Sequence, residues 1–364
     1  MMPKAMPLIP LLVLLCAGAP AESTNQPPVA VWDATALVST GVGYRNNVLR
    51  SSIATEDSAF FLSSVDASVM RLSESGAYFL LYLFGEDIRY FNAPSVDYEQ
   101  IFSCTAQFVQ PVGSRNEAGL EANYLYQHTI VDASVNEVDL QRVLVRGHGA
   151  TLRPHWRHKA GDWEAKLEGV VLRQIYESEL DDYWESGGRI SLARNYGNRS
   201  MVSVGFLPML RTYDTREQYD QSGNAEPGTD LTYSLNEADG EWRHYWDAER
   251  HWRTASKLSY LANRDNGSGY FDYDRLQLRQ QVRWENDVWN ISGIARFGWY
   301  LYKEQYVDNE RRERSYVTLS YRIERRFGKH WMLFTAGEHE WNMSNDPLDD
   351  YRSWMASGGA GYEF

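Results

Sequence analysis

The chain has 364 residues, a net charge of −13 and 43% hydrophobic residues. Its mean hydropathy is −0.52, and beyond the N-terminus there is no run of about 18 apolar residues, so a bundle of transmembrane helices is excluded. Aromatic residues make up 14% of the chain, which excludes intrinsic disorder. The acidic balance argues against a nucleic-acid partner. A chain of this length can fold as one all-β domain.

The first 21 residues have the composition of a secretory signal peptide. Lys4 precedes an apolar run over 8–15, and the small-residue cleavage site Ala19-Pro20-Ala21 follows. A buried N-terminal helix is one alternative. Cys16 raises a second, a lipoprotein, although the small residues typical of that class do not precede this cysteine.

Cleavage after residue 21 leaves Cys104 as the one remaining cysteine, so no intramolecular disulfide can form. No cofactor-binding motif is found either. Residues 22–31 are polar and proline-rich, which predicts a disordered lead-in. The folded domain is therefore expected to span residues 32–364.

After the lead-in, the sequence alternates apolar and polar residues instead of showing a helical period. Alternation with a period of two places one set of side chains on each face of a sheet. We count sixteen alternating segments, and allow a range of 14–18 strands. They cover residues 33–44, 58–71, 76–91, 97–110, 116–130, 140–156, 162–177, 187–197, 200–213, 241–253, 256–263, 272–285, 288–302, 315–327, 331–342 and 351–364.

The connections between these segments alternate in length. Most odd-numbered connections are long, namely 45–57, 131–139, 178–186, 214–240, 264–271, 303–314 and 343–350, whereas 92–96 is shorter. Even-numbered connections are tight, at 72–75, 157–161, 197–198, 254–255, 286–287 and 328–330. Long loops on one side and short turns on the other are typical of an outer-membrane β-barrel. This pattern predicts a single closed antiparallel barrel.

Aromatic residues ten positions apart on one face predict interfacial girdles. At about 3.3 Å per residue and a tilt of about 40°, such a pair spans about 25 Å, the height of the apolar band of a membrane barrel. The predicted pairs are Trp242 with Trp252, Trp289 with Trp299, Trp331 with Trp341, and Trp354 with Phe364. Aromatic residues scattered in soluble strands are the alternative.

The last strand ends in an aromatic residue, with Tyr362 two positions before Phe364 on the same face. This ending resembles the C-terminal signal of Gram-negative outer-membrane barrels. The resemblance implies the barrel-assembly machinery as a partner, reached through Tyr362 and Phe364. It also implies outer-membrane lipid and lipopolysaccharide as the surroundings of the barrel.

Strand parity places charged residues inside the barrel. The basic ones are Arg275, Arg279, Arg283, Arg296, Arg322 and Arg326. The acidic ones are Glu164, Glu168, Asp247, Glu249, Glu324, Glu338 and Glu340. The basic residues either form an open stripe that guides anions or an acidic polymer, or belong to a paired network that fixes the barrel's shape. Residues 214–240 could fold inward and narrow the channel.

Several other sites were considered. His155 and His158 could bind a metal at a turn, but two ligands are too few for a structural site. His251 is expected inside, beside Asp247 and Glu249, whereas His339 is expected outside. The outer loops are acidic and could bridge divalent cations to anionic lipid. An acid–His hydrolase at the outer rim would use carboxylates such as Asp181, Asp182, Asp349 and Asp350.

The first predicted strand closes with Gly43-Tyr44-Arg45-Asn46-Asn47-Val48. This stretch resembles the Gly-Tyr-x-x-Asn-[Val/Ile] start of the β-barrel porin-2 family, although that family usually has Asp where Arg45 stands. The resemblance implies an outer-membrane barrel, and some relatives accompany exopolysaccharide export.

We expect a porin-like channel of the cell outer membrane, not an enzyme, for passive diffusion of small polar or anionic solutes. An export conduit for an acidic exopolysaccharide and an outer-membrane hydrolase active at the rim are the alternatives.

Overall fold

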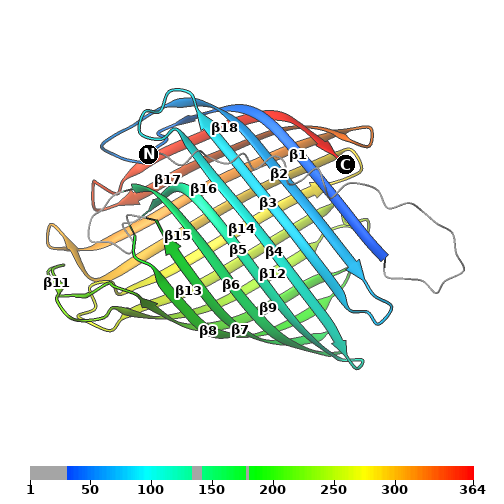
Figure 1. Cartoon of the computed structure of the whole chain (residues 1–364), viewed down its shortest axis with the longest axis horizontal. Helices are drawn as coiled ribbons and strands as arrows, with labels where there is room; N and C mark the ends of the chain where they lie inside the picture. Colours follow the sequence, from blue (N-terminus) through cyan, green and yellow to red (C-terminus); the bar gives the residue numbers. More distant parts are fainter. Residues whose placement is uncertain (1–30, 133–141, 178–179) are drawn as a thin grey trace, which may run out of the picture.

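The computed structural model describes residues 31–132, 142–177 and 180–364. Sixteen strands in this part of the chain close into one antiparallel barrel, and their common slant is visible in Figure 1. This confirms the predicted fold. The proposed signal peptide and nearly all of the lead-in lie outside the described residues. Within the described part, no helix is long and apolar enough to cross a membrane.

The barrel strands follow the chain in order around the wall, and the first strand pairs with the last. They are β1 (Val31–Asn46), β2 (Ser58–Leu72), β3 (Tyr78–Tyr90), β4 (Tyr98–Val112), β5 (Asn116–Asp132), β6 (Arg142–Ala160), β7 (Trp163–Tyr176), β8 (Tyr183–Tyr196), β9 (Ser200–Tyr213), β12 (Thr232–Tyr245), β13 (Trp252–Asp265), β14 (Tyr273–Glu285), β15 (Trp289–Val307), β16 (Glu310–Phe327), β17 (Trp331–Ser344) and β18 (Tyr351–Glu363).

Alternating burial is clear in strands such as β9, where successive side chains lie on opposite faces of the wall. In β9, Val204 and Phe206 are exposed on the outer face, whereas the intervening Gly205 is partly buried on the inner face. Closure pairs the edges that an open sheet would leave without hydrogen-bond partners. The predicted parity of the connections is also present, because tight turns such as 161–162 alternate with longer loops such as 47–57.

The tenth predicted segment, 241–253, was placed too late in the chain. The structure forms β12 at Thr232–Tyr245 and β13 at Trp252–Asp265, so the turn lies at 246–251 and not at 254–255. The preceding loop is therefore shorter than the predicted 214–240. It carries a small hairpin of its own, formed by β10 (Gln218–Tyr219) and β11 (Ala225–Glu226), at the left of Figure 1.

The prediction of a loop at residues 303–314 is also wrong, because most of these residues belong to strands. β15 and β16 continue to a two-residue turn at Asp308 and Asn309, which have positive φ angles of 48° and 70°. Aspartate and asparagine tolerate this left-handed backbone better than most residues, which makes them suited to tight hairpin turns. The resulting β15–β16 hairpin extends beyond the last paired residues of β14 and β17, Tyr273 and Ser344.

The seam between β1 and β18 is built on glycines. A Cβ atom at Gly43 would meet the ring of Phe60 and would lie 2.5 Å from the carbonyl oxygen of Ala356. A Cβ atom at Gly359 would lie 2.6 Å from the Cα atom of Gly41. Glycine is therefore required here because side chains and neighbouring backbone occupy the space of a Cβ atom.

Two buried clusters pack against the wall on different sides of the barrel. The first includes Phe60 and Tyr90 of β2 and β3, together with Phe334 of β17. The second is rich in tyrosine and includes Tyr233 and Tyr300 of β12 and β15. The first cluster reaches Ile130 of β5 and the second begins at Tyr213 of β9, so β6 to β8 lie between them on one side of the barrel order and β16 on the other.

Candidate channel lumen

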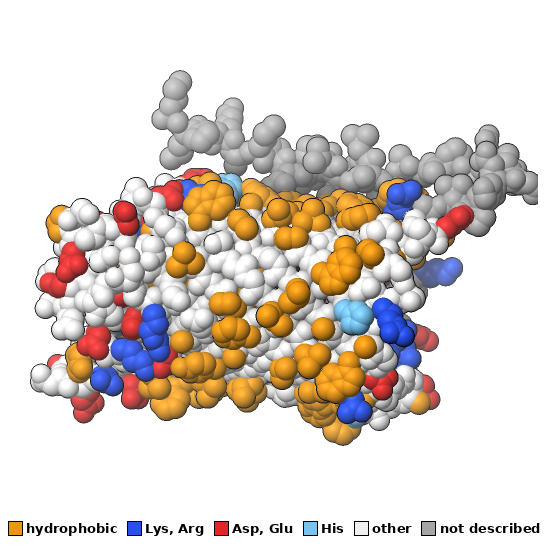
Figure 2. Space-filling view, turned by 90° about the horizontal axis from the view of Figure 1, so that it is seen from below, with side chains coloured by type: hydrophobic (Ala, Val, Ile, Leu, Met, Phe, Trp, Pro, Cys, Tyr) orange, Lys and Arg blue, Asp and Glu red, His pale blue; other side chains and the backbone are white. Residues whose placement is uncertain are grey.

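The outer face of the barrel is apolar around its middle. Leu278, Leu319 and Leu333 are each more than 40% exposed, far more than is usual for leucines of a folded protein core. Figure 2 shows hydrophobic side chains spread over the middle of the visible wall and charged side chains gathered at both ends. Such a band matches the surface that a membrane barrel presents to lipid.

Three of the four predicted aromatic pairs each lie on one face of a single strand. Trp331 and Trp341 lie toward the two ends of β17, Trp354 and Phe364 lie toward the two ends of β18, and Trp289 and Trp299 lie at the start and in the middle of β15. His339 also faces outward, as expected, because it stacks on Trp341 with ring centroids 3.7 Å apart.

The fourth pair, Trp242 and Trp252, is corrected by the structure. Trp242 lies near the end of β12 and Trp252 at the start of β13, so both are beside the 246–251 turn at one end of the barrel. Both side chains are exposed. The apparent ten-residue spacing arose because the sequence pattern did not locate the turn between them.

Strand register places the six arginines of the predicted basic stripe on the inner face of the barrel wall. The guanidinium group of Arg322 lies 4.5 Å from the ring centroid of Phe334, which belongs to the first internal cluster. Parity places Arg326 and Glu324 on the same inner face of β16. Arg275, Arg279 and Arg283 share the inner face of β14, and Arg279 lies directly opposite Arg296 of β15.

Much of this stripe is paired with carboxylates. Arg283 lies 2.8 Å from Glu285, and Arg322 lies 2.6 Å from Glu324. Arg275 is 3.6 Å from Glu237 of β12. The paired-network interpretation therefore applies to these three arginines, whose charges are locally balanced.

Arg279 and Arg296 differ from the rest of the stripe. Within the described residues, neither side chain forms an ion pair or a hydrogen bond, and Arg279 is exposed to the lumen. Lys257 of β13 lies directly opposite Arg279 on the same face. Lys257 is not among the predicted lumen residues, although its alternation with the apolar Leu258 indicates an inward position.

The acidic residues that were predicted to face the lumen lie in two places, on the barrel strands and in the 246–251 turn. Glu164 lies 3.1 Å from Arg157, Glu168 pairs with Lys166, and Glu340 lies 3.6 Å from Arg50. Parity places Glu338 on the inner face of β17.

Asp247, Glu249 and His251 lie in the 246–251 turn and not on a lumen-facing strand, which corrects the prediction. Their ligand atoms fall within 4.8 Å of one another. Desolvation raises the pKa of the Asp247 carboxyl, but backbone N–H groups of Trp252 and His251 donate to it and lower the pKa below its ordinary value. This carboxylate therefore stabilises the turn.

The residues proposed for other chemistry are not brought together. His155 is buried on the inner face of β6, whereas His158 is exposed on the outer face, so the two cannot share a metal ion. Asp349 is buried and lies 2.9 Å from Arg312, which removes it from the rim surface. Asp182 accepts a hydrogen bond from the backbone N–H of Tyr176.

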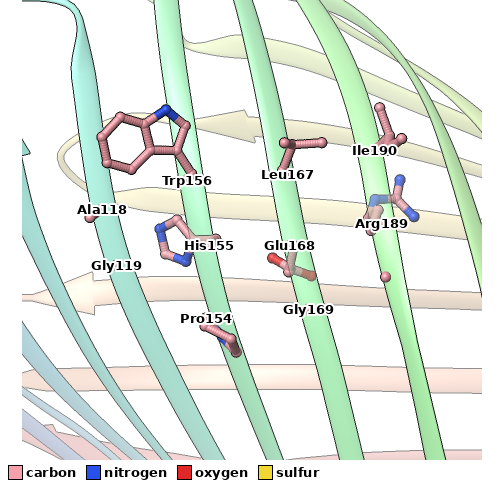
Figure 3. A pocket seen from close by; sticks show the side chains of 11 residues that line it. Ala118, Gly119, Pro154, His155, Trp156, Leu167, Glu168, Gly169, Arg189 and Ile190 are labelled. Carbon is pink, nitrogen blue, oxygen red and sulfur yellow. The ribbon is translucent and has the colours of Figure 1, made fainter.

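A shallow groove of about 630 Å³ crosses β5 to β8 (Figure 3). The small residues Ala118, Gly169 and Gly188 line the groove together with Pro154 and Trp156. Register pairing between β6 and β7 is missing at Pro154, because proline has no backbone N–H to donate. The groove is mainly apolar and lies in the wall, not at the cationic residues of the lumen.

No protein-family model matches the chain, and no curated protein matches it. Among solved structures, CdiB from Acinetobacter baumannii has a TM-score of 0.49 and 8% identity over 91% of this chain, which spans 60% of the length of CdiB. The anion-selective porin from Comamonas acidovorans has a TM-score of 0.46 and 11% identity, covering 92% of this chain and 100% of the porin. OprD from Pseudomonas aeruginosa has a TM-score of 0.45 and 11% identity, with 91% and 95% covered.

These three scores are below 0.5, so the fold assignment rests on the strand pairing of this chain. The likeness of residues 43–48 to the β-barrel porin-2 family has no support from a family model.

Proposed function

We propose that the chain forms a channel of the bacterial outer membrane through which small polar solutes, anions in particular, diffuse passively. The observation that carries the proposal is the inverted arrangement of side chains. Leu278 and Leu319 are exposed on the outer wall, whereas Arg279 and Arg296 face the interior. A soluble barrel would gain free energy from the opposite arrangement.

The dimensions agree with this proposal. Strands of 13 to 19 residues tilted by about 40° rise about 33 to 48 Å, which exceeds the hydrocarbon thickness of about 25 Å expected for such barrels. Sixteen strands are enough for an aqueous lumen. Low-dielectric walls concentrate the field of inward charges in such a space, so the unpaired Arg279 and Arg296 favour anions.

The test is single-channel recording with the full chain in planar bilayers under a potassium chloride gradient. We expect discrete conductance steps and a reversal potential that favours chloride at low salt. The preference should fall as salt screens the inward charges. Purified, folded barrel that gives no conductance, or that prefers potassium, would contradict the proposal.

A further inference from the structure

Three cationic side chains form a row across the inner wall. Lys257 of β13 is directly opposite Arg279 of β14, and Arg279 is directly opposite Arg296 of β15. Directly opposed residues of antiparallel strands share a face, and their Cα atoms lie about 4.5 to 5.5 Å apart. The three positive groups are therefore anchored within about 11 Å of one another on one patch of the lumen wall.

Like charges placed directly opposite each other destabilise a sheet, so the row needs a compensating charge. Among the described residues, the carboxylates nearest the row are all on β12. Glu241 is directly opposite Lys257 and lies 3.0 Å from Arg243. The Lys257 ammonium is 3.8 Å from Glu237 and 3.9 Å from Asp239. Glu237 is shared with Arg275, and Asp239 lies 2.5 Å from Arg189. These two carboxylates are thus already engaged with other cations, and no carboxylate within the described residues forms an ion pair with Arg279 or Arg296.

The residues flanking the row are neutral and can donate hydrogen bonds. Gln277 and Gln281 stand two positions to either side of Arg279 on the inner face of β14. Gly298 lies two positions from Arg296 on the inner face of β15, and the ring of Tyr316 covers Gly298. The Tyr316 hydroxyl oxygen would lie 2.8 Å from a Cβ atom added to Gly298. The patch therefore combines three cations with amide and hydroxyl donors.

We propose that Lys257, Arg279 and Arg296 bind an oxyanion carrying at least two negative charges, of the phosphate or pyrophosphate class. The planar guanidinium groups of arginine match the oxygens of such anions in bidentate geometry. A divalent anion also compensates two of the opposed charges at once, which chloride cannot do. This inference rests on the proposed channel function, because the ligand reaches the row through the lumen.

The experiment measures inorganic pyrophosphate binding to the full chain in detergent by calorimetry, and block of chloride conductance by pyrophosphate in planar bilayers. Wild type should bind pyrophosphate and show concentration-dependent block, with acetate inactive at the same concentration. R279Q and R296Q, each measured alone, should weaken binding about tenfold, the loss expected for one charged hydrogen-bonding partner. R283Q is the matched control, because Arg283 lies on the same face of β14 but is paired with Glu285, and it should bind like wild type.

The two proposals fail in different ways. Pyrophosphate binding in detergent without any conductance would support the site and overturn the channel. Chloride conductance without pyrophosphate binding would keep the channel and overturn the site, as would equal losses in R279Q and R283Q. Folding of every variant is checked by its heat-dependent mobility on SDS gels. Pyrophosphate should raise the unfolding temperature of wild type and R283Q more than that of R279Q, and equal shifts would also refute the site.

Discussion

Closure of the barrel at the β1–β18 seam can be tested with one added methyl group. In Gly359→Ala, the new Cβ would lie 2.6 Å from the Cα atom of Gly41 and would also meet the carbonyl oxygen of Thr40. Real Cβ atoms essentially never approach closer than 3.0 Å. The Gly41 contact alone requires the two strands to separate by about 0.4 Å, the difference between these two distances, and the closer Thr40 oxygen requires more. Overpacking of this kind costs about 1–3 kcal/mol.

The adjacent residue provides a matched control. A Cβ atom at Gly358 has the carbonyl oxygen of Phe334 as its nearest neighbour, at 3.5 Å, which is ordinary van der Waals contact. Gly358→Ala should therefore be neutral, or stabilise the fold by up to about 1 kcal/mol because alanine loses less backbone entropy. The unfolding midpoints on SDS gels should place Gly359→Ala below wild type and Gly358→Ala at or above it. Equal midpoints for the two variants would refute the close-packed seam.

Three further predictions concern topology, a buried ion pair and assembly. An epitope after Gly223 should be stained on intact cells and one after Gly161 should not, because the two sites lie at opposite ends of the barrel. The reverse staining would contradict the predicted orientation of the barrel in the membrane. Glu99→Leu should lower stability by about 3–5 kcal/mol, seen as a lower unfolding midpoint, because it leaves the buried Arg45 without its carboxylate at 2.7 Å. Deleting Phe364 should reduce the amount of folded barrel in outer-membrane fractions, since it removes the N–H that donates to Ala36; an unchanged amount would exclude a role in assembly.

The period-two pattern predicted the barrel and most strand positions, because alternation between lipid and lumen acts on every residue of every strand. It failed at Trp242 and Trp252, where aromatic residues continue through a turn and hide the change of direction. It also failed at residues 303–314, where charged residues suggested a loop although most of this segment belongs to β15 and β16. Polarity alone does not distinguish a solvent-exposed strand from a loop.

The lumen was predicted less completely than the wall. Parity correctly placed Arg279 and Arg283 on one face, but the partners of these residues depend on strand register. Register brings Lys257 and Arg296 to either side of Arg279, although these residues are far apart along the chain. A charge balance in the lumen therefore requires the cross-strand pairs as well as the pattern within each strand.

The projecting β15–β16 hairpin has a consequence for how two copies of the barrel can associate. Beyond Tyr302 and Arg314, its two strands no longer have register partners on β14 and β17, and free strand edges promote pairing with other chains. At the tip, Asn345 covers part of the β16 edge, because it donates to the carbonyl of Arg311 and accepts from the N–H of Glu313. The exposed side chains of the tip are charged, at Glu310, Arg311 and Glu313, whereas Arg312 is buried against Asp349. Charged edges oppose such pairing, so the exposed Glu310, Arg311 and Glu313 disfavour edge-to-edge association between two copies of the barrel.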